Sequence, residues 1–188
     1  MQEKEVADKV DLLVQGIALK RFQSHSRFAD IEVTKLEVPD PGIGGRWMAL
    51  ILIAGKSIRI TFKVHFHEYV TRIVAANLYG KKPETLTVHQ ILDFIKEFCN
   101  LTAGGVKTQF ETSNLTVGIS LPLATRGFDD VFFPVPNQET GFGTSWLLTV
   151  PSGQFKCSTF IEVMDPKALD NVSFEVVEKA DDGEVEFL

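Results

Sequence analysis

The chain has 188 residues and a mass of 20.9 kDa, and 44% hydrophobic with 23% charged residues predicts one globular domain over residues 1–188. Its longest apolar run, residues 47–54, is far shorter than the roughly 20 residues that span a bilayer. The first residues include acids and lead into no apolar segment, unlike a secretory signal. We therefore expect a cytoplasmic protein with no membrane partner, in which Cys99 and Cys157 are buried thiols.

The net negative charge is concentrated at one end of the chain. Residues 165–188 hold eight acids and two lysines, which account for the whole formal net charge of −6 and leave residues 1–164 balanced. Neither part has the basic stripe that binding to a nucleic-acid backbone requires. We therefore expect no nucleic-acid partner, and we treat residues 165–188 as an acidic C-terminal segment of the domain.

The first third of the chain predicts a helix, a strand and a hairpin. Apolar residues recur at helical spacing over residues 3–20, which indicates an amphipathic helix that packs on the core. Residues 31–38 alternate apolar and polar side chains, as a half-buried strand does. Two β-rich runs, 47–54 and 58–66, flank the turn residues Gly55-Lys56-Ser57 and predict a hairpin.

Two further helices are expected in the middle of the chain. Residues 67–79 place apolar side chains on one helical face, with Gly80 as the C-cap. A longer helix is predicted from Thr87 to about residue 110, because Thr87 and Gln90 have the spacing of a capping box.

The rest of the chain is rich in short β-like runs. Strands are predicted at residues 115–121, 131–135, 146–150 and 155–163, as a meander, and residues 172–176 alternate like an edge strand. The expected fold class is therefore α/β of the α+β type, in which an antiparallel sheet packs against long helices.

The helix from residue 87 to 110 has two opposite faces on a wheel of about 100° per residue. Asp93, Glu97, Asn100 and Gly104, which we call the polar band, are predicted to face outward. The residues of the opposite, core-facing stripe are Val88, Ile91, Leu92, Ile95, Cys99, Thr102 and Val106.

The polar band has features that suit contact with a partner. Glu97 and Asn100 are spaced i, i+3, so a carboxylate and a carboxamide project side by side. Gly104 and Gly105 expose bare backbone although glycine costs about 1 kcal/mol in a helix, which suggests close approach of another surface. The ordinary alternative is that acids and amides simply occupy the solvated face of an amphipathic helix.

The residues of this helix resemble a known family. Asp93, Glu97 four residues later, Asn100 three residues after that and Pro122 after a long spacer match the signature of the CheX and CheC chemotaxis phosphatases. The segments around these residues, 100–105 and 118–122, also look like the family's. A second copy of the signature is absent.

In family members with two active helices, the second copy of the signature lies on the helix that corresponds to the N-terminal helix here. Leu12 and Gln15 follow Asp8 there, where family members with two active helices carry glutamate and asparagine. The resemblance is therefore to the CheX type, with one active helix and a CheC-like fold.

The resemblance implies a function for the polar band. It implies a phosphatase that removes the aspartyl phosphate of a CheY-like response-regulator receiver. Asn100 would position the attacking water, Glu97 would bond the receiver's active-site lysine, and Asp93 and Gly104 would contribute to partner binding. It implies no cofactor of the chain's own, because the receiver supplies the divalent metal, and it implies a homodimer.

A non-catalytic module with the same fold, which binds a receiver or another signalling component, remains the alternative function. Phe94, Phe98 and Leu101 flank the polar band and would serve a docking surface or a homodimer contact in either case.

Rival sites in the sequence are weaker. The triplet at Gly55 is not a nucleotide-binding loop, because Leu50 stands where that loop needs a glycine and a strand follows. His65, His67 and Glu68 could bind a metal, with His25 or His89 completing the set, but this spacing is a weak signal and we expect no metal site. Cys99 lies on the core-facing stripe, where a catalytic thiolate is poorly stabilised.

Overall fold

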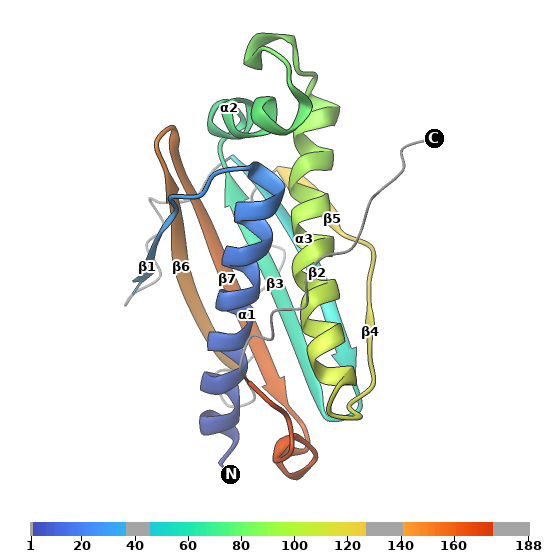
Figure 1. The fold of residues 1–188 in the computed structure, drawn as a ribbon. Coiled ribbons are helices and arrows are strands. Elements are labelled where there is room, and N and C mark those ends of the chain that lie inside the picture. The colour runs from blue at the N-terminus through green and yellow to red at the C-terminus, as the bar shows by residue number, and fades with distance from the viewer. Residues whose placement is uncertain (1, 37–45, 127–140, 175–188) are drawn as a thin grey trace.

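The computed structural model describes residues 2–36, 46–126 and 141–174, and these form one antiparallel sheet covered on one face by helices (Figure 1). The elements in chain order are α1 (Glu3–Ser26), β1 (Glu32–Leu36), β2 (Trp47–Gly55), β3 (Ile58–Phe66), α2 (Glu68–Tyr79), η1 (Pro83–Thr85), α3 (Val88–Glu111), β4 (Val117–Ile119), β5 (Leu123–Arg126), β6 (Phe142–Val150), β7 (Gly153–Val163) and η2 (Pro166–Leu169). The α+β class is confirmed. That the whole chain forms one domain stays a prediction.

The strand order is β1-β6-β7-β3-β2-β4, with β5 also paired to β2. All pairs are antiparallel, and the hairpins β2–β3 and β6–β7 join at the centre, where β7 pairs with β3. This is not the simple meander expected of the later strands. The expected strand at 131–135 lies outside the described residues, and β5 was not predicted.

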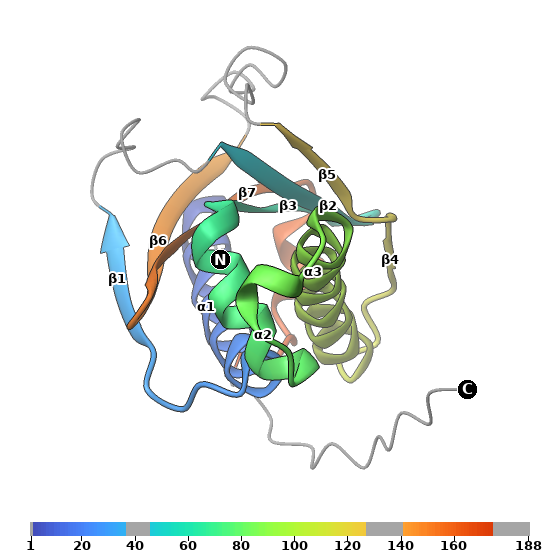
Figure 2. The same ribbon diagram turned by 90° about the horizontal axis from the view of Figure 1, so that it is seen from above.

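The helices form a second layer on the concave face of the sheet. α1 and α3 lie side by side along the strands, and α2 crosses one end of the pair, while the sheet curves around them (Figures 1 and 2). α1 extends six residues further than the periodicity predicted, to Ser26, and ends where Arg27 adopts a left-handed conformation. The core therefore lies between two long helices and the sheet.

An aromatic cluster fills the space where α1, α3 and the sheet meet. Phe22 of α1 contacts Phe94 and Phe98 of α3 edge to face, with ring centroids 6.4 and 5.0 Å apart. Phe94 and Phe98 are completely buried. The expectation that Phe94 and Phe98 are exposed docking residues beside the polar band is therefore wrong. The sheet buries one side of α3, and α1 packs against another side and buries these two rings as well.

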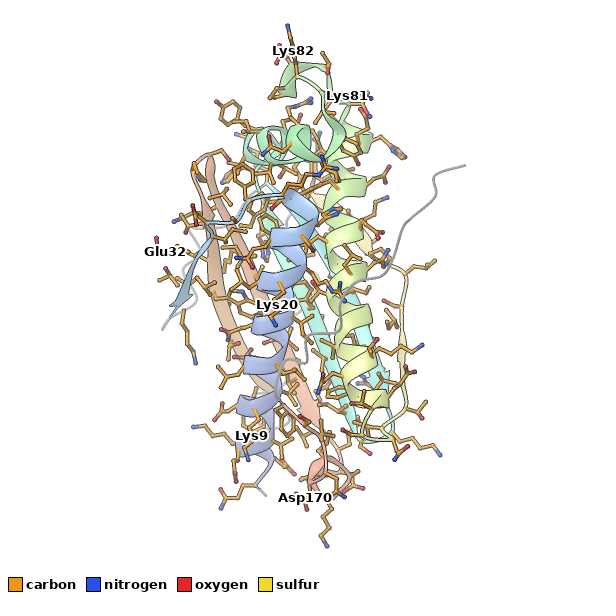
Figure 3. All side chains as sticks on the ribbon, viewed as in Figure 1. Lys9, Lys20, Glu32, Lys81, Lys82 and Asp170 are labelled. Carbon is orange, nitrogen blue, oxygen red and sulfur yellow. The ribbon has the colours of Figure 1, made fainter. Side chains whose placement is uncertain are left out.

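Two strand expectations also need correction. β1 forms, but nearly all of its side chains are exposed rather than half-buried, because it is an edge strand that pairs with β6 beyond the reach of the helices; Glu32 lies at the outer edge of the molecule (Figures 2 and 3). Residues 172–174 are not a strand. They pack on α3 instead, where Gln109 Nε2 donates to Ser173 O at 2.8 Å, and the remainder of the predicted edge strand lies outside the described residues.

Candidate active site

The position of α3 is set by its first turn. Thr87 is the N-cap, and its Oγ1 accepts from Gln90 N at 3.2 Å while Gln90 Oε1 accepts from Thr87 N at 3.0 Å. This capping box was predicted and is confirmed, and it fixes the residue at which the helix begins. Ile91, Ile95, Cys99, Thr102 and Val106 are buried as expected, whereas Val88, the first residue of the helix, is 39% exposed.

Glu97 and Asn100 project together from the outer face of α3. Both side chains are exposed, and Asn100 Nδ2 donates to Glu97 Oε2 at 3.3 Å. This bond uses one N–H of the amide and one oxygen of the carboxylate. Asn100 Oδ1 and Glu97 Oε1 therefore remain available to accept hydrogen bonds from a partner or a water.

Asp93 is engaged differently from Glu97. It is half-buried, and its two oxygens pair with His89 Nδ1 and with Lys96 Nζ on the same helix, each at 2.6 Å. Glu97 has no such cation beside it among the described residues. Within the polar band, Glu97 is therefore the carboxylate that is free to meet a positive charge from outside.

The two adjacent glycines of α3 have different surroundings. A methyl group added at Gly104 would meet no atom of the other described elements within 4 Å, so the described residues leave open space above it. A methyl group at Gly105 would lie 2.6 Å from Ile17 Cγ2 of α1. Gly104 thus fits the predicted open face, whereas Gly105 is explained by close packing of α1 on α3 within the chain.

Two residues outside α3 border the polar band. His25, in the last turn of α1, bonds Phe94 O through Nε2 at 3.0 Å, and Tyr79 at the end of α2 donates to Gln90 O at 3.4 Å. Burial lowers the pKa of His25, although the Glu97 carboxylate acts in the opposite direction. Burial, with Asp93 and Glu97 nearby, raises the pKa of Tyr79.

Sequence reasoning missed both of these neighbours as part of this site. His25 lies 69 residues from Phe94 in the chain, and no local pattern reports a contact of that range.

Pro122 lies in a bulge on the sheet edge beside α3. Ile53 of β2 pairs with Ile119 of β4, and Leu50 of β2 pairs with Leu123 of β5. Between these two pairs β2 contains two residues, whereas the chain from β4 to β5 contains three. The extra residue produces a β-bulge between β4 and β5, and Leu121 next to Pro122 is 90% exposed. A bulge of this kind suits a proline, which has no N–H for the sheet ladder.

The rival sites find no support in the described residues. No three His, Cys, Asp or Glu side chains among them are grouped so as to hold a metal ion. His67 serves as the N-cap residue of α2, and its carbonyl accepts from Thr71 N and Oγ1. Cys99 and Cys157 are free and buried, as expected, and burial raises the pKa of both thiols.

No helix within residues 2–36, 46–126 and 141–174 is long and apolar enough to cross a membrane.

Comparison with known proteins adds a family and a fold. The family model described as chemotaxis phosphatase CheX matches residues 47–134, which include the polar band and Pro122. No curated protein matches the sequence.

Solved structures share the fold at low sequence identity. CheX from Vibrio vulnificus is 16% identical, with a TM-score of 0.63 over 80% of this chain and 97% of that chain. A CheC-like protein from Shewanella sp. PV-4 is 15% identical, with a TM-score of 0.64 over 80% and 97% of the two chains. CheX from Borrelia burgdorferi, solved with CheY, BeF3 and Mg²⁺, is 14% identical, with a TM-score of 0.63 over 80% and 96%. The fold is the CheC-like fold, and residues 47–134 are similar to the CheX chemotaxis phosphatase family.

Proposed function

We propose that the protein hydrolyses the aspartyl phosphate of a CheY-like response-regulator receiver, with α3 presented to the phosphorylated site. The observation that carries this proposal is the exposed Glu97–Asn100 pair on the outer face of α3, within the residues that match the CheX family model. The solved complex of Borrelia burgdorferi CheX with CheY, BeF3 and Mg²⁺ supports a receiver as the partner.

Asn100 is proposed to orient the attacking water. Its Nδ2 is held by Glu97 Oε2 at 3.3 Å, which leaves Oδ1 to accept a hydrogen bond from the water. An amide is too weak a base to take the proton, so its contribution is positional, and holding two reactants in line can remove several kcal/mol from a barrier. The receiver supplies the divalent metal and the lysine that neutralise the phosphoryl oxygens.

Glu97 is proposed to dock the receiver. Its second oxygen, Oε1, is available for the ammonium group of the receiver's lysine while Oε2 still holds Asn100. One carboxylate would therefore fix both the partner and the amide that orients the water. Gly104, with open space above it, would allow close approach of the receiver one turn further along the helix.

Asp93 is proposed to play a smaller part in partner binding. Its two oxygens already pair with His89 and Lys96, so its charge attracts a receiver cation less strongly than that of Glu97.

The decisive experiment measures phosphate release from a phosphorylated receiver with and without this protein. Asn100→Ala should lower hydrolysis toward the receiver's own rate while binding largely survives. Glu97→Ala should weaken both, since truncating one member of a charged interface pair costs about 2–5 kcal/mol. Thr108→Ala, at another exposed position two turns beyond Asn100, is the control and should behave like the parent.

Two outcomes would contradict the proposal. If Asn100→Ala accelerates hydrolysis as well as the parent, Asn100 does not position the water. If the parent binds a receiver without hydrolysis, the non-catalytic module is the better description.

We also infer a homodimer. Both edges of the described sheet are open, at β1 and at β4–β5, and the second carries the exposed Leu121 and Leu123. Sedimentation at micromolar concentration should give twice the chain mass, and a strictly monomeric mass would contradict this inference.

A further inference from the structure

Two polar side chains from neighbouring helices bond backbone carbonyls of α3 beside its outer face. His25 of α1 bonds Phe94 O at 3.0 Å and Tyr79 of α2 donates to Gln90 O at 3.4 Å. These two carbonyls are four residues apart and so lie one above the other on a single edge of the helix. The helix segment that leads into Glu97 is therefore tied to both of its neighbours.

His25 makes a second contact in the same place. Its ring stacks on the Phe94 ring, with centroids 4.4 Å apart and planes 21° from parallel. Phe94 is completely buried and also contacts Phe22, edge to face. The imidazole thus connects the aromatic core to the surface at the turn of α3 that comes just before Glu97.

The chemistry of His25 also bears on the charge of Glu97. The imidazole is close enough for the carboxylate to influence its pKa, yet burial favours the neutral ring. A neutral ring with its proton on Nε2 donates to Phe94 O and brings no full positive charge to Glu97. A lysine or arginine in this position would compete for the carboxylate, as Lys96 does for Asp93.

We propose that His25 is a positioning residue of the phosphatase site: it fixes the α3 turn that presents Glu97 and leaves that carboxylate uncompensated for the receiver. This rests on the proposed function. His25 touches neither the water nor the phosphoryl group in this arrangement, so its effect on catalysis passes through Glu97.

The test is a double-mutant cycle between His25→Phe and Glu97→Ala, with the full-length protein and a phosphorylated receiver. Phenylalanine keeps the stacking but removes the hydrogen bond. His25→Phe should raise KM by about three- to tenfold and change kcat less, because docking is the step that Glu97 serves. In the Glu97→Ala background the same change should leave KM unaltered. His25→Gln, whose amide can donate to Phe94 O, should recover part of the loss.

Two controls separate this role from ordinary packing. Ile17→Val removes a methyl group from the other half of the α1–α3 contact, beside Gly105, and should leave KM unchanged. Thermal unfolding of each variant establishes that it is folded.

The outcomes divide clearly. An unchanged KM in His25→Phe, or an equal fold-change with and without Glu97, would show a merely structural residue and overturn the proposal while the phosphatase function stands. A parent protein that neither binds nor hydrolyses a phosphorylated receiver would overturn the proposed function, and the role of His25 with it.

Discussion

α1 and α3 make an internal comparison, because both are 24 residues long and run antiparallel on the same face of the sheet (Figure 1). Their outer faces differ. α3 presents the carboxylate and amide of Glu97 and Asn100, whereas α1 presents Leu12, which is 64% exposed, in the position where a second signature would have its glutamate. The fold thus contains two long helices of equal length, and only α3 carries the exposed glutamate and asparagine on which the proposed function rests.

The inner faces of the two helices also differ, because only that of α1 carries a carboxylate. α1 buries a carboxylate: Asp11 is 2% exposed and accepts hydrogen bonds from Thr144 Oγ1, from Thr159 Oγ1 at 2.6 Å and from Gln15 Nε2 at 2.6 Å. α3 turns its acids outward. Asp11 therefore attaches α1 to strands β6 and β7, while Glu97 and Asn100 of α3 are exposed.

Asp11→Ala should give the largest effect on stability. It removes the shared acceptor of two buried or half-buried threonine hydroxyls, those of Thr144 and Thr159, which lie 3.0 Å apart. We expect the free energy of unfolding to fall by about 2–3 kcal/mol in urea titrations. Asp8→Ala, at an exposed position of the same helix, should change it by less than about 0.5 kcal/mol. Equal effects of the two changes would contradict an anchoring role for Asp11.

Gly105→Ala should give the next largest effect. Its methyl group would lie 2.6 Å from Ile17 Cγ2, so α1 and α3 must move apart or Ile17 must shift. Overpacking costs about 1–3 kcal/mol, and the gain of about 1 kcal/mol in helix propensity offsets part of it. A net loss of up to about 2 kcal/mol in chemical denaturation is expected, and a more stable variant would show that the contact is loose.

Gly104→Ala should have the opposite sign at the neighbouring position. Within the part of the chain that the structure describes, the added methyl group meets no neighbouring element within 4 Å, so the variant gains helix propensity and should be more stable by up to about 1 kcal/mol. The same methyl group stands on the proposed receiver surface, so receiver binding should weaken as stability rises. Binding measured by calorimetry that stays at the parent value would remove Gly104 from that surface.

The sequence was informative where the signals are local. The phase of α3 followed from its capping residues and its period of 3.6, which placed Glu97 and Asn100 on the outside and Cys99 inside, as observed. The hairpin of β2 and β3 followed from alternation around a turn. These features depend on residues within a few positions of one another.

Contacts between distant segments were not predictable in this way. Phe94 and Phe98 are buried because α1 lies beside α3, and a helix wheel drawn for one helix has no information on a second neighbour. The bulge beside Pro122 needed the register of two strands, and the buried Asp11 needed its partner threonines on β6 and β7, about 130 to 150 residues away.

The smallest expected effect concerns the point where the two helices meet. Burial lowers the pKa of His25 from its ordinary value of 6.5, so the unfolded chain binds a proton at this site more readily than the folded protein does. The stability that the neutral ring contributes is therefore present above the unfolded pKa and is lost as the pH falls through the folded pKa. The parent should therefore lose stability relative to His25→Gln as the pH falls below the ordinary pKa of 6.5, in urea titrations of both proteins. The other histidines are common to the two proteins, so their titration cancels in the difference. A difference that does not change with pH would mean that His25 titrates alike in both states, and that its ring is not held neutral against Phe94.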